Sequence, residues 1–258
     1  MIWVASLLFT SLIFICPSVA RAQKLQPFST SGLESLPPPW RAVGLPNAKT
    51  PLTRLDVVSI DGMRVLRLTS DKSYGNALHE LVPVVPGQGS LLRWQWRLDQ
   101  PLMAADLRTK GGDDAALKVC LLFDMPLEKL GVLERNVLWL ARAASPEKLP
   151  AATLCYVWDH LYPANTELPN AFSPRLRFIV LDSGEKQLGQ WIAHERDIVA
   201  DFRRAFGHET DTTPPLIGIA VGADSDNTRS ASLAYLGDLT LTFAPPQASS
   251  VPPVPVKQ

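Results

Sequence analysis

The sequence is poor in charge, cysteine and histidine, and each shortage excludes a class of protein. Only 19% of the 258 residues are charged, and 25 basic side chains balance 25 acidic ones. A nucleic-acid partner is excluded, because binding a phosphate backbone requires clustered Lys and Arg. The three cysteines and four histidines have no zinc-type spacing. The chain also lacks a G-x-S-x-G motif, a P-loop and a dinucleotide fingerprint.

The N-terminus carries the pattern of a signal peptide. Residues 2–15 are apolar, and the small residues Ala20 and Ala22 stand where signal peptidase requires them. The run of about 14 residues is shorter than the roughly 20 that cross a bilayer as a helix. We therefore expect residues 1–22 to be cleaved after Ala22. The product would be periplasmic or secreted, without a membrane span.

Export leaves two cysteines in the mature chain, Cys120 and Cys155. Both lie in segments that read as strands. In an oxidising compartment they form a disulfide if those strands are neighbours. The alternative is a pair of buried thiols that behave as small hydrophobes.

Alternating apolar and polar residues predict strands along most of the mature chain. Asp61-Gly62 stands between the first two candidates and is typical of a two-residue hairpin turn. About ten strands without alternating long helices predict an all-β fold, an antiparallel β-sandwich of jelly-roll type. The candidate strands are residues 52–60, 63–70, 77–82, 90–98, 115–123, 153–158, 175–181, 189–195, 217–222 and 232–243.

Two short helices are expected within this sandwich. Residues 126–144 and 197–206 carry apolar side chains at helical spacing, and Gly207 is a suitable stop for the second helix. We therefore expect one β-sandwich domain over residues 52–243. A Pro/Ser-rich segment, residues 23–51, precedes it, and a Pro-rich disordered tail, residues 244–258, follows.

The acidic turn Asp224-Ser225-Asp226-Asn227-Thr228 is a candidate Ca²⁺ site. Alternating oxygen-bearing side chains between two strands can surround a hard cation, and Asp238 in the last predicted strand could add a carboxylate. The expected metal ligands are Asp224, Asp226 and Asp238. The alternative is an ordinary turn, because Asp, Asn and Ser are also common turn formers.

The aromatic residues suggest either a core or a sugar-binding face. Trp94 and Trp96 alternate with charged residues, so they fill the core or form a stacking platform. Tyr156, Trp158, Tyr162 and Trp191 stand at strand ends or loops, where they could contact a ligand; the alternative is that they too belong to the core.

Arg196 completes this candidate ligand-binding set. It could bind a carboxylate of the ligand. The alternative is that it pairs with Asp201.

An ordered set of short motifs resembles the domain-of-unknown-function family three-zero-four-seven, whose members are exported bacterial proteins. The resemblance covers roughly residues 52–243 and implies a periplasmic β-sandwich shaped like a carbohydrate-binding module, without an assigned activity. The motifs are Trp94-Gln95-Trp96, Asp113-Asp114-Ala115, Leu149-Pro150, Tyr156-Val157-Trp158, Ser183-Gly184, Leu188-Gly189-Gln190-Trp191, Arg196, Asp201-Phe202, Phe206-Gly207, Asp224-Ser225-Asp226-Asn227-Thr228 and Ala234-Tyr235-Leu236-Gly237-Asp238.

The sequence therefore favours a non-catalytic, exported binder of a glycan or cell-envelope ligand, with a structural Ca²⁺. One alternative is a polysaccharide- or envelope-acting hydrolase with acids drawn from Asp113, Asp114 and Glu195. Another is an envelope assembly or scaffold protein that reaches a partner with its Pro-rich tail and the 126–144 helix. The sequence does not indicate an oligomeric state.

Overall fold

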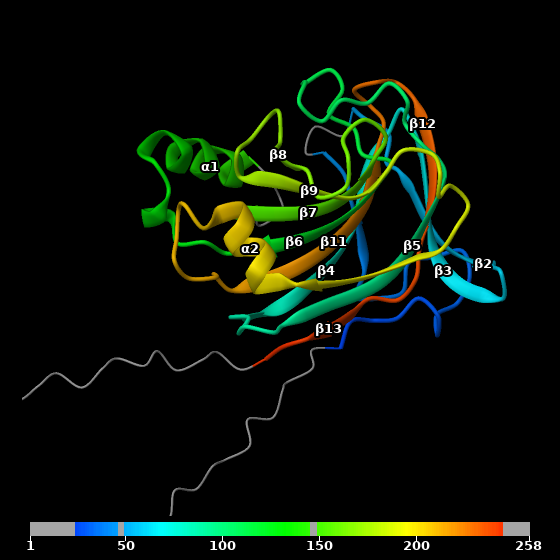
Figure 1. Ribbon diagram of the computed structural model, residues 1–258, viewed down its shortest axis with the longest axis horizontal. Helices are drawn as coiled ribbons and strands as arrows, with labels where there is room; N and C mark the ends of the chain where they lie inside the picture. Colours follow the sequence, from blue (N-terminus) through cyan, green and yellow to red (C-terminus); the bar gives the residue numbers. More distant parts are fainter. Residues whose placement is uncertain (1–23, 46–48, 145–148, 245–258) are drawn as a thin grey trace, which may run out of the picture.

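The computed structural model describes residues 24–45, 49–144 and 149–244, most of which lie in two packed β-sheets (Figure 1). The expected signal peptide and residues 245–258 of the expected tail lie outside these ranges. Within the described ranges, no helix combines the length and the apolar character needed to cross a membrane.

The first sheet has seven strands, and its neighbours are antiparallel except for β7 and β9, which run parallel. The order across this sheet is β1 (Arg41–Val43), β4 (Tyr74–Val84), β11 (Leu216–Asp224), β6 (Leu117–Phe123), β7 (Ala152–Asp159), β9 (Leu176–Ser183) and β8 (Glu167–Pro169).

The second sheet has six strands and is antiparallel. Asp61 and Gly62 close the β2–β3 hairpin with φ of 52° and 77°, the left-handed conformation that a tight hairpin turn requires. The order is β10 (Ile192–Asp197), β5 (Leu91–Gln100), β12 (Ala231–Leu236), β3 (Met63–Asp71) and β2 (Arg54–Ile60), and β13 (Thr240–Thr242) also pairs with β5.

The predicted all-β sandwich with short helices is confirmed, and the jelly-roll connectivity stays a prediction. Each predicted strand is present, but the stretch 232–243 is divided into β12 and β13 at residues 237–239. Two three-residue strands, β1 and β8, were not predicted, because three residues are too few to display a period of two.

The core lies between the sheets and contains the inward side chains of β5 and β7. Trp94 stacks on Tyr156 with ring centroids 5.3 Å apart, and Trp96 contacts Trp158 at 6.3 Å. Trp94 and Trp96 are therefore core residues. Tyr156 and Trp158 are also fully buried. Of the two alternatives for Tyr156 and Trp158, core or ligand contact, the structure has the core position, because the strand alternation turns both side chains inward.

The helices lie at one end of the sandwich (Figure 1). They are a 3₁₀ turn η1 (Leu127–Lys129), α1 (Val132–Ala144) and α2 (Ile198–Phe206). Asp197 caps α2 by accepting from the backbone N–H groups of Val199 and Ala200, and Gly207 follows its last residue. The ring of Phe202 is buried, and its centroid lies 4.7 Å from that of Phe123 on β6, so α2 closes this end of the core.

The Pro/Ser-rich N-terminal segment is part of the folded unit. Leu25, Phe28 and Trp40 are buried in the main core, and the Trp40 indole donates to the Gln26 carbonyl at 2.7 Å. Strand β1 pairs with β4. The fold therefore begins well before residue 52, through aromatic contacts that a Pro-rich pattern does not reveal.

Cys120 and Cys155 stand directly opposite each other on β6 and β7 and form a disulfide. They belong to a smaller apolar cluster separate from the main core. The bond joins two central strands of the seven-stranded sheet. It also closes a loop in the unfolded chain, which lowers the conformational entropy of the unfolded state.

Candidate functional site

The six-stranded sheet carries an open hollow of about 870 Å³ on its outer face. Its lining includes the outward side chains of β5 and β10. Gln95 is opposite Ala193, and Arg93 is opposite Glu195, whereas Trp94 and its partner His194 face the other way. Because cross-strand partners share one face of a sheet, these four residues form two adjacent outward pairs.

Gly237 leaves room for the Gln95 side chain in the lining of the hollow. Its N–H donates to the Gln95 carbonyl at 2.9 Å, and a Cβ at this position would lie 2.8 Å from Gln95 Cγ. The Gln95 amide also approaches Met63 Sδ at 3.5 Å. A side chain at position 237 would therefore displace Gln95. Residues of both β3 and β5 line the hollow together with Gly237, which directly follows β12.

One wall of the hollow includes Asp238, which links it to the N-terminal segment. Asp238 Oδ1 accepts from the backbone N–H groups of Phe28 and Ser29 at 2.6 and 3.0 Å, and Oδ2 accepts from the Ser29 hydroxyl. Ser29 and Asp238 both line the hollow. Asp238 thus anchors the N-terminal segment. It is not among the carboxylates that approach Asp224 and Asp226, which corrects its assignment as a third metal ligand.

Trp191 lies on the same outer face, immediately before β10. Its indole N–H donates to Asp61 Oδ2 at 3.1 Å, and the same oxygen accepts from Arg97 at 2.8 Å. Asp61 belongs to the β2–β3 turn, whose other residue, Gly62, lines the hollow. Of the predicted ligand-binding aromatics, Trp191 is therefore the one that lies beside the hollow with part of its side chain exposed.

Arg196 is paired inside the protein. Its guanidinium donates to both oxygens of Asp201, at 2.8 and 2.6 Å, and the Tyr156 hydroxyl donates to the same carboxylate at 2.8 Å. Burial, followed by the Asp201 charge, raises the pKa of Tyr156 well above its usual value. The pairing of Arg196 with Asp201 is confirmed. Because the Arg196 guanidinium is engaged by Asp201, this arrangement does not offer it to a ligand carboxylate.

Three carboxylates meet where β11 ends and the loop before β6 reaches that strand. Asp114, Asp224 and Asp226 each have an oxygen within 4.8 Å of the others, and we call them the acidic cluster. Lys118 donates to Asp224 at 2.7 Å, and the Ala115 N–H donates to the same oxygen at 3.0 Å. Both partners of the Lys118–Asp224 pair are buried.

The turn predicted as a cation site wraps around Asp114. The carboxylate accepts from the backbone N–H groups of Asn227 and Thr228 at 3.1 and 2.6 Å and from the Thr228 hydroxyl at 2.6 Å. Asp226 Oδ1 is buried without a hydrogen-bond partner. Asp114 therefore takes the place expected for Asp238, a substitution that sequence spacing does not show because Asp114 is 110 residues away from Asp224.

The electrostatics of the acidic cluster favour a bound cation or a bound proton. Burial, followed by neighbouring carboxylates, raises the pKa of Asp226, and burial also raises that of Asp224 against the opposing effect of Lys118. Burial raises the pKa of the adjacent Asp113 to about 6. Carboxylate oxygens are the ligands that Ca²⁺ prefers, so the residues present fit that ion.

The acids proposed for hydrolysis are divided between two places. Asp113 accepts from the Asn170 amide next to the acidic cluster, and Asp114 belongs to that cluster. Glu195 instead forms an ion pair with Arg93 on the outer face of the other sheet. The arrangement therefore does not assemble Glu195 with Asp113 and Asp114.

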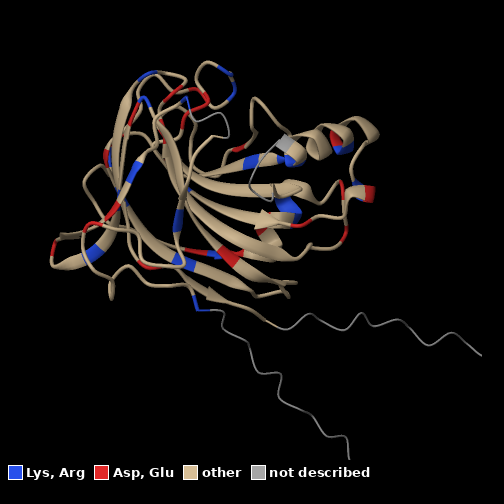
Figure 2. Ribbon diagram, turned by 180° about the vertical axis from the view of Figure 1, so that it is seen from behind, with Lys and Arg blue, Asp and Glu red and all other residues tan. Residues whose placement is uncertain are grey.

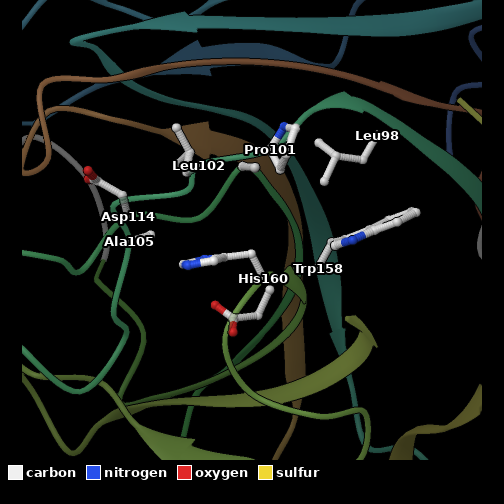
Figure 3. Close-up of a pocket in the computed structure, with 9 residues that line it drawn as sticks. Leu98, Pro101, Leu102, Ala105, Asp114, Trp158 and His160 are labelled. Atoms are coloured by element: carbon white, nitrogen blue, oxygen red, sulfur yellow. The ribbon is translucent and has the colours of Figure 1, made fainter. Parts of the chain in front are cut away.

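A small cavity near Asp114 is bordered by Trp158 and His160 (Figure 3). Its volume of about 10 Å³ is close to that occupied by one water molecule. It cannot accept a sugar ring, in agreement with the burial of Trp158.

Basic and acidic residues are interspersed over the fold (Figure 2). On the outer face of the six-stranded sheet, Arg67 donates twice to Asp56, and Arg97 donates to Asp99. The face around the hollow is therefore polar but internally paired, which suits a ligand bound by hydrogen bonds rather than by net charge.

The sequence matches the family described as "Protein of unknown function (DUF3047)" over residues 38–240. The chain belongs to this family. A search of curated proteins gives no significant match.

Solved structures give distant likenesses. One is the glycoside hydrolase domain Spr0440, Endo-D, from Streptococcus pneumoniae R6, with 10% identity and a TM-score of 0.33 over 78% of this chain. This chain spans only 21% of that structure. Another is endoglucanase 3 of family GH12 from Trichoderma harzianum, with 9% identity and a TM-score of 0.39, covering 81% of this chain and 100% of that one.

Proposed function

We propose that this protein is an exported, non-catalytic binder of a glycan or another cell-envelope ligand. The observation that carries the proposal is the 870 Å³ hollow on the outer face of the six-stranded sheet, with Trp191 beside it. A hollow of this size falls within the range of about 300–1,000 Å³ typical of small-ligand sites.

The chemistry of the hollow suits a polyhydroxylated ligand. The Gln95 amide both donates and accepts hydrogen bonds, and the Arg93–Glu195 pair has further N–H donors and oxygen lone pairs beyond the bond that joins them. Trp191 offers an apolar ring next to these polar groups. Two successive rows of outward side chains on β5 and β10 hold these groups on rigid strands.

Binding is favoured over hydrolysis because the carboxylates of the hollow already have partners. Glu195 is paired with Arg93, and Asp238 is held by three donors from Phe28 and Ser29. A glycosidase of the usual kind needs two carboxyls about 5–10 Å apart, one of them protonated when the leaving group departs. In the hollow, the two carboxylates of the lining are instead held by these partners.

A structural Ca²⁺ at the acidic cluster accompanies this proposal. The unpartnered Asp226 oxygen and the raised pKa values of Asp224 and Asp226 support it. Such an ion would join the end of β11 to the loop before β6, outside the hollow.

The test uses the chain from Gln23 onward with a panel of polysaccharides and peptidoglycan. Retardation measures binding, and new reducing ends in the same samples measure cleavage. We expect binding without cleavage, and new reducing ends would overturn the non-catalytic assignment. Neither binding nor cleavage with any member of the panel would contradict the glycan proposal.

Two variants locate the site once a ligand is found. Ala193→Trp fills the hollow from an exposed strand position, and Trp191→Ala removes the adjacent ring. We expect each to weaken binding about tenfold or more, the loss of roughly 1.4 kcal/mol. Leu161→Ala, an exposed apolar residue outside the hollow, is the matched control and should bind like the parent. Unchanged binding by Ala193→Trp would place the ligand elsewhere.

A further inference from the structure

Helix α1 turns its apolar side chains toward solvent. Five large hydrophobic residues of this 13-residue helix are between 59% and 77% exposed, and we call them the α1 face: Val132, Leu133, Val137, Trp139 and Leu140. At about 100° per residue they occupy one arc of roughly 160°. An amphipathic helix of a monomeric protein normally shows the opposite orientation, with such residues turned inward.

Most of the polar side of α1 faces the protein instead, and only its Arg135 is exposed, outside the arc of the α1 face. Leu138, which lies opposite the centre of the α1 face, is buried. Arg142 donates to the Leu149 carbonyl at 2.8 Å and approaches Asp124 at 3.5 Å. Glu134 lies 3.9 Å from Arg175. These contacts fix the rotation of the helix, so the exposed face is a property of the fold.

We infer that the α1 face is a homodimer interface, on which the same face of a second copy of this chain packs in an isologous contact. The arc contains no ionisable side chain; Asn136 and Ala143 are its other exposed members. In an isologous contact each patch meets its own copy, so a charged patch would repel itself, whereas this one would not. Asn136 can pair with the partner's equivalent amide, since an amide both donates and accepts.

The exposed area agrees with a small dimer interface. Four aliphatic side chains of about 100 Å² each, roughly two-thirds exposed, and one indole of about 250 Å² give about 400 Å² per copy. With the backbone and neighbouring polar atoms, a symmetric pair would bury about 1,000 Å² in total. This is the lower limit of specific interfaces, so we expect dissociation in the micromolar range.

A lipid surface fits this helix less well. Helices that lie in a membrane interface carry Lys and Arg along their polar face. Here Glu134 and Arg142 are turned toward the protein, where they contact Arg175 and Asp124, and Arg135 is the one exposed cation among the described side chains of α1. A single arginine beside the α1 face adds little attraction to anionic lipid.

Sedimentation equilibrium of the chain from Gln23 onward, between about 1 and 200 µM, tests the proposal. We expect the mass to rise from one chain to two over the micromolar range. Leu140→Glu should abolish the dimer, and so should Leu140→Lys. An equimolar mixture of the two variants should regain it, because opposite charges then meet across the two-fold axis. Leu161→Glu, an exposed apolar position outside the α1 face, should dimerise like the parent.

Other outcomes overturn the proposal. A parent that stays monomeric at 200 µM would refute it. In that case, vesicles of phosphatidylglycerol and phosphatidylethanolamine that bind the parent but not Leu140→Glu would assign the face to lipid. A dimer that survives both Leu140 variants would place the interface elsewhere. A monomeric parent that dimerises only when residues 245–258 are deleted would mean that the chain's own tail covers the face. The circular dichroism spectrum shows whether each variant has folded.

Discussion

Removal of one carboxyl charge should make the protein more stable at neutral pH. Burial raises the pKa of Asp113 to about 6, against a usual 3.8. The native state therefore favours the protonated form. The stabilisation that results is complete below pH 4 and is lost as the pH rises through about 6, because the unfolded chain releases this proton more readily. Asp113→Asn stays neutral and keeps an oxygen that can accept from the Asn170 amide.

The expected size follows from this shift of about two pKa units. Fully expressed, it corresponds to about 3 kcal/mol. Solvent screens the carboxylate in part, so we expect about 1–2 kcal/mol. Urea unfolding, followed by tryptophan fluorescence at pH 4, 5, 6 and 7 with chelator present, measures it. The free-energy difference between Asp113→Asn and the parent should grow by that amount from pH 4 to 7. Asp211→Asn, at an exposed position, controls for net charge, and a difference independent of pH would refute the reasoning.

Three further outcomes are expected. Chelator should lower the melting temperature, and Ca²⁺ but not Mg²⁺ should restore it; the absence of any shift would remove the calcium proposal and leave a proton shared within the acidic cluster. Asp201→Asn should cost about 2–4 kcal/mol in urea unfolding, because the Arg196 guanidinium loses its counter-charge and the Tyr156 hydroxyl loses its strongest acceptor; a cost below 0.5 kcal/mol would contradict this account. Replacing Cys120 and Cys155 by Ala should cost about 3–4 kcal/mol, from a closed loop with a sequence separation of 35 residues, and equal stability of parent and variant under oxidising conditions would disprove it.

The sandwich was predictable because its strands carry their own signal. Period-two alternation locates a strand from a few residues, and Asp61-Gly62 identifies a hairpin from its turn chemistry alone. Strands β1 and β8 carry no such signal. They lie at the two edges of the seven-stranded sheet and are defined by their hydrogen bonds to β4 and β9. The role of Trp40 was likewise hidden, because its burial depends on contacts with residues far along the chain, such as His79.

The candidate site was less predictable, because pairing register assembles it. Asp224 and Asp226 were found from local spacing, but Asp114 reaches them only through the packing of the loop before β6. Gln95 and Ala193 acquire significance as a cross-strand pair, and Gly237 matters because Gln95 lies over it. None of these relations is visible until the partners of each strand are known.

The alternation of one strand pair decides which aromatic residues can bind a ligand. His194 is opposite Trp94, which lies in the core, so Ala193 and Glu195 point outward, and Trp191 continues that outward series. Tyr156 and Trp158 follow the same alternation on β7, but their parity directs them into the core. A shift of β10 by one residue against β5 would exchange the two faces and bury Glu195 opposite Leu92 or Trp94. Because burial of an unpaired carboxylate is costly, the register that protects the core is also the one that holds Trp191 at the hollow.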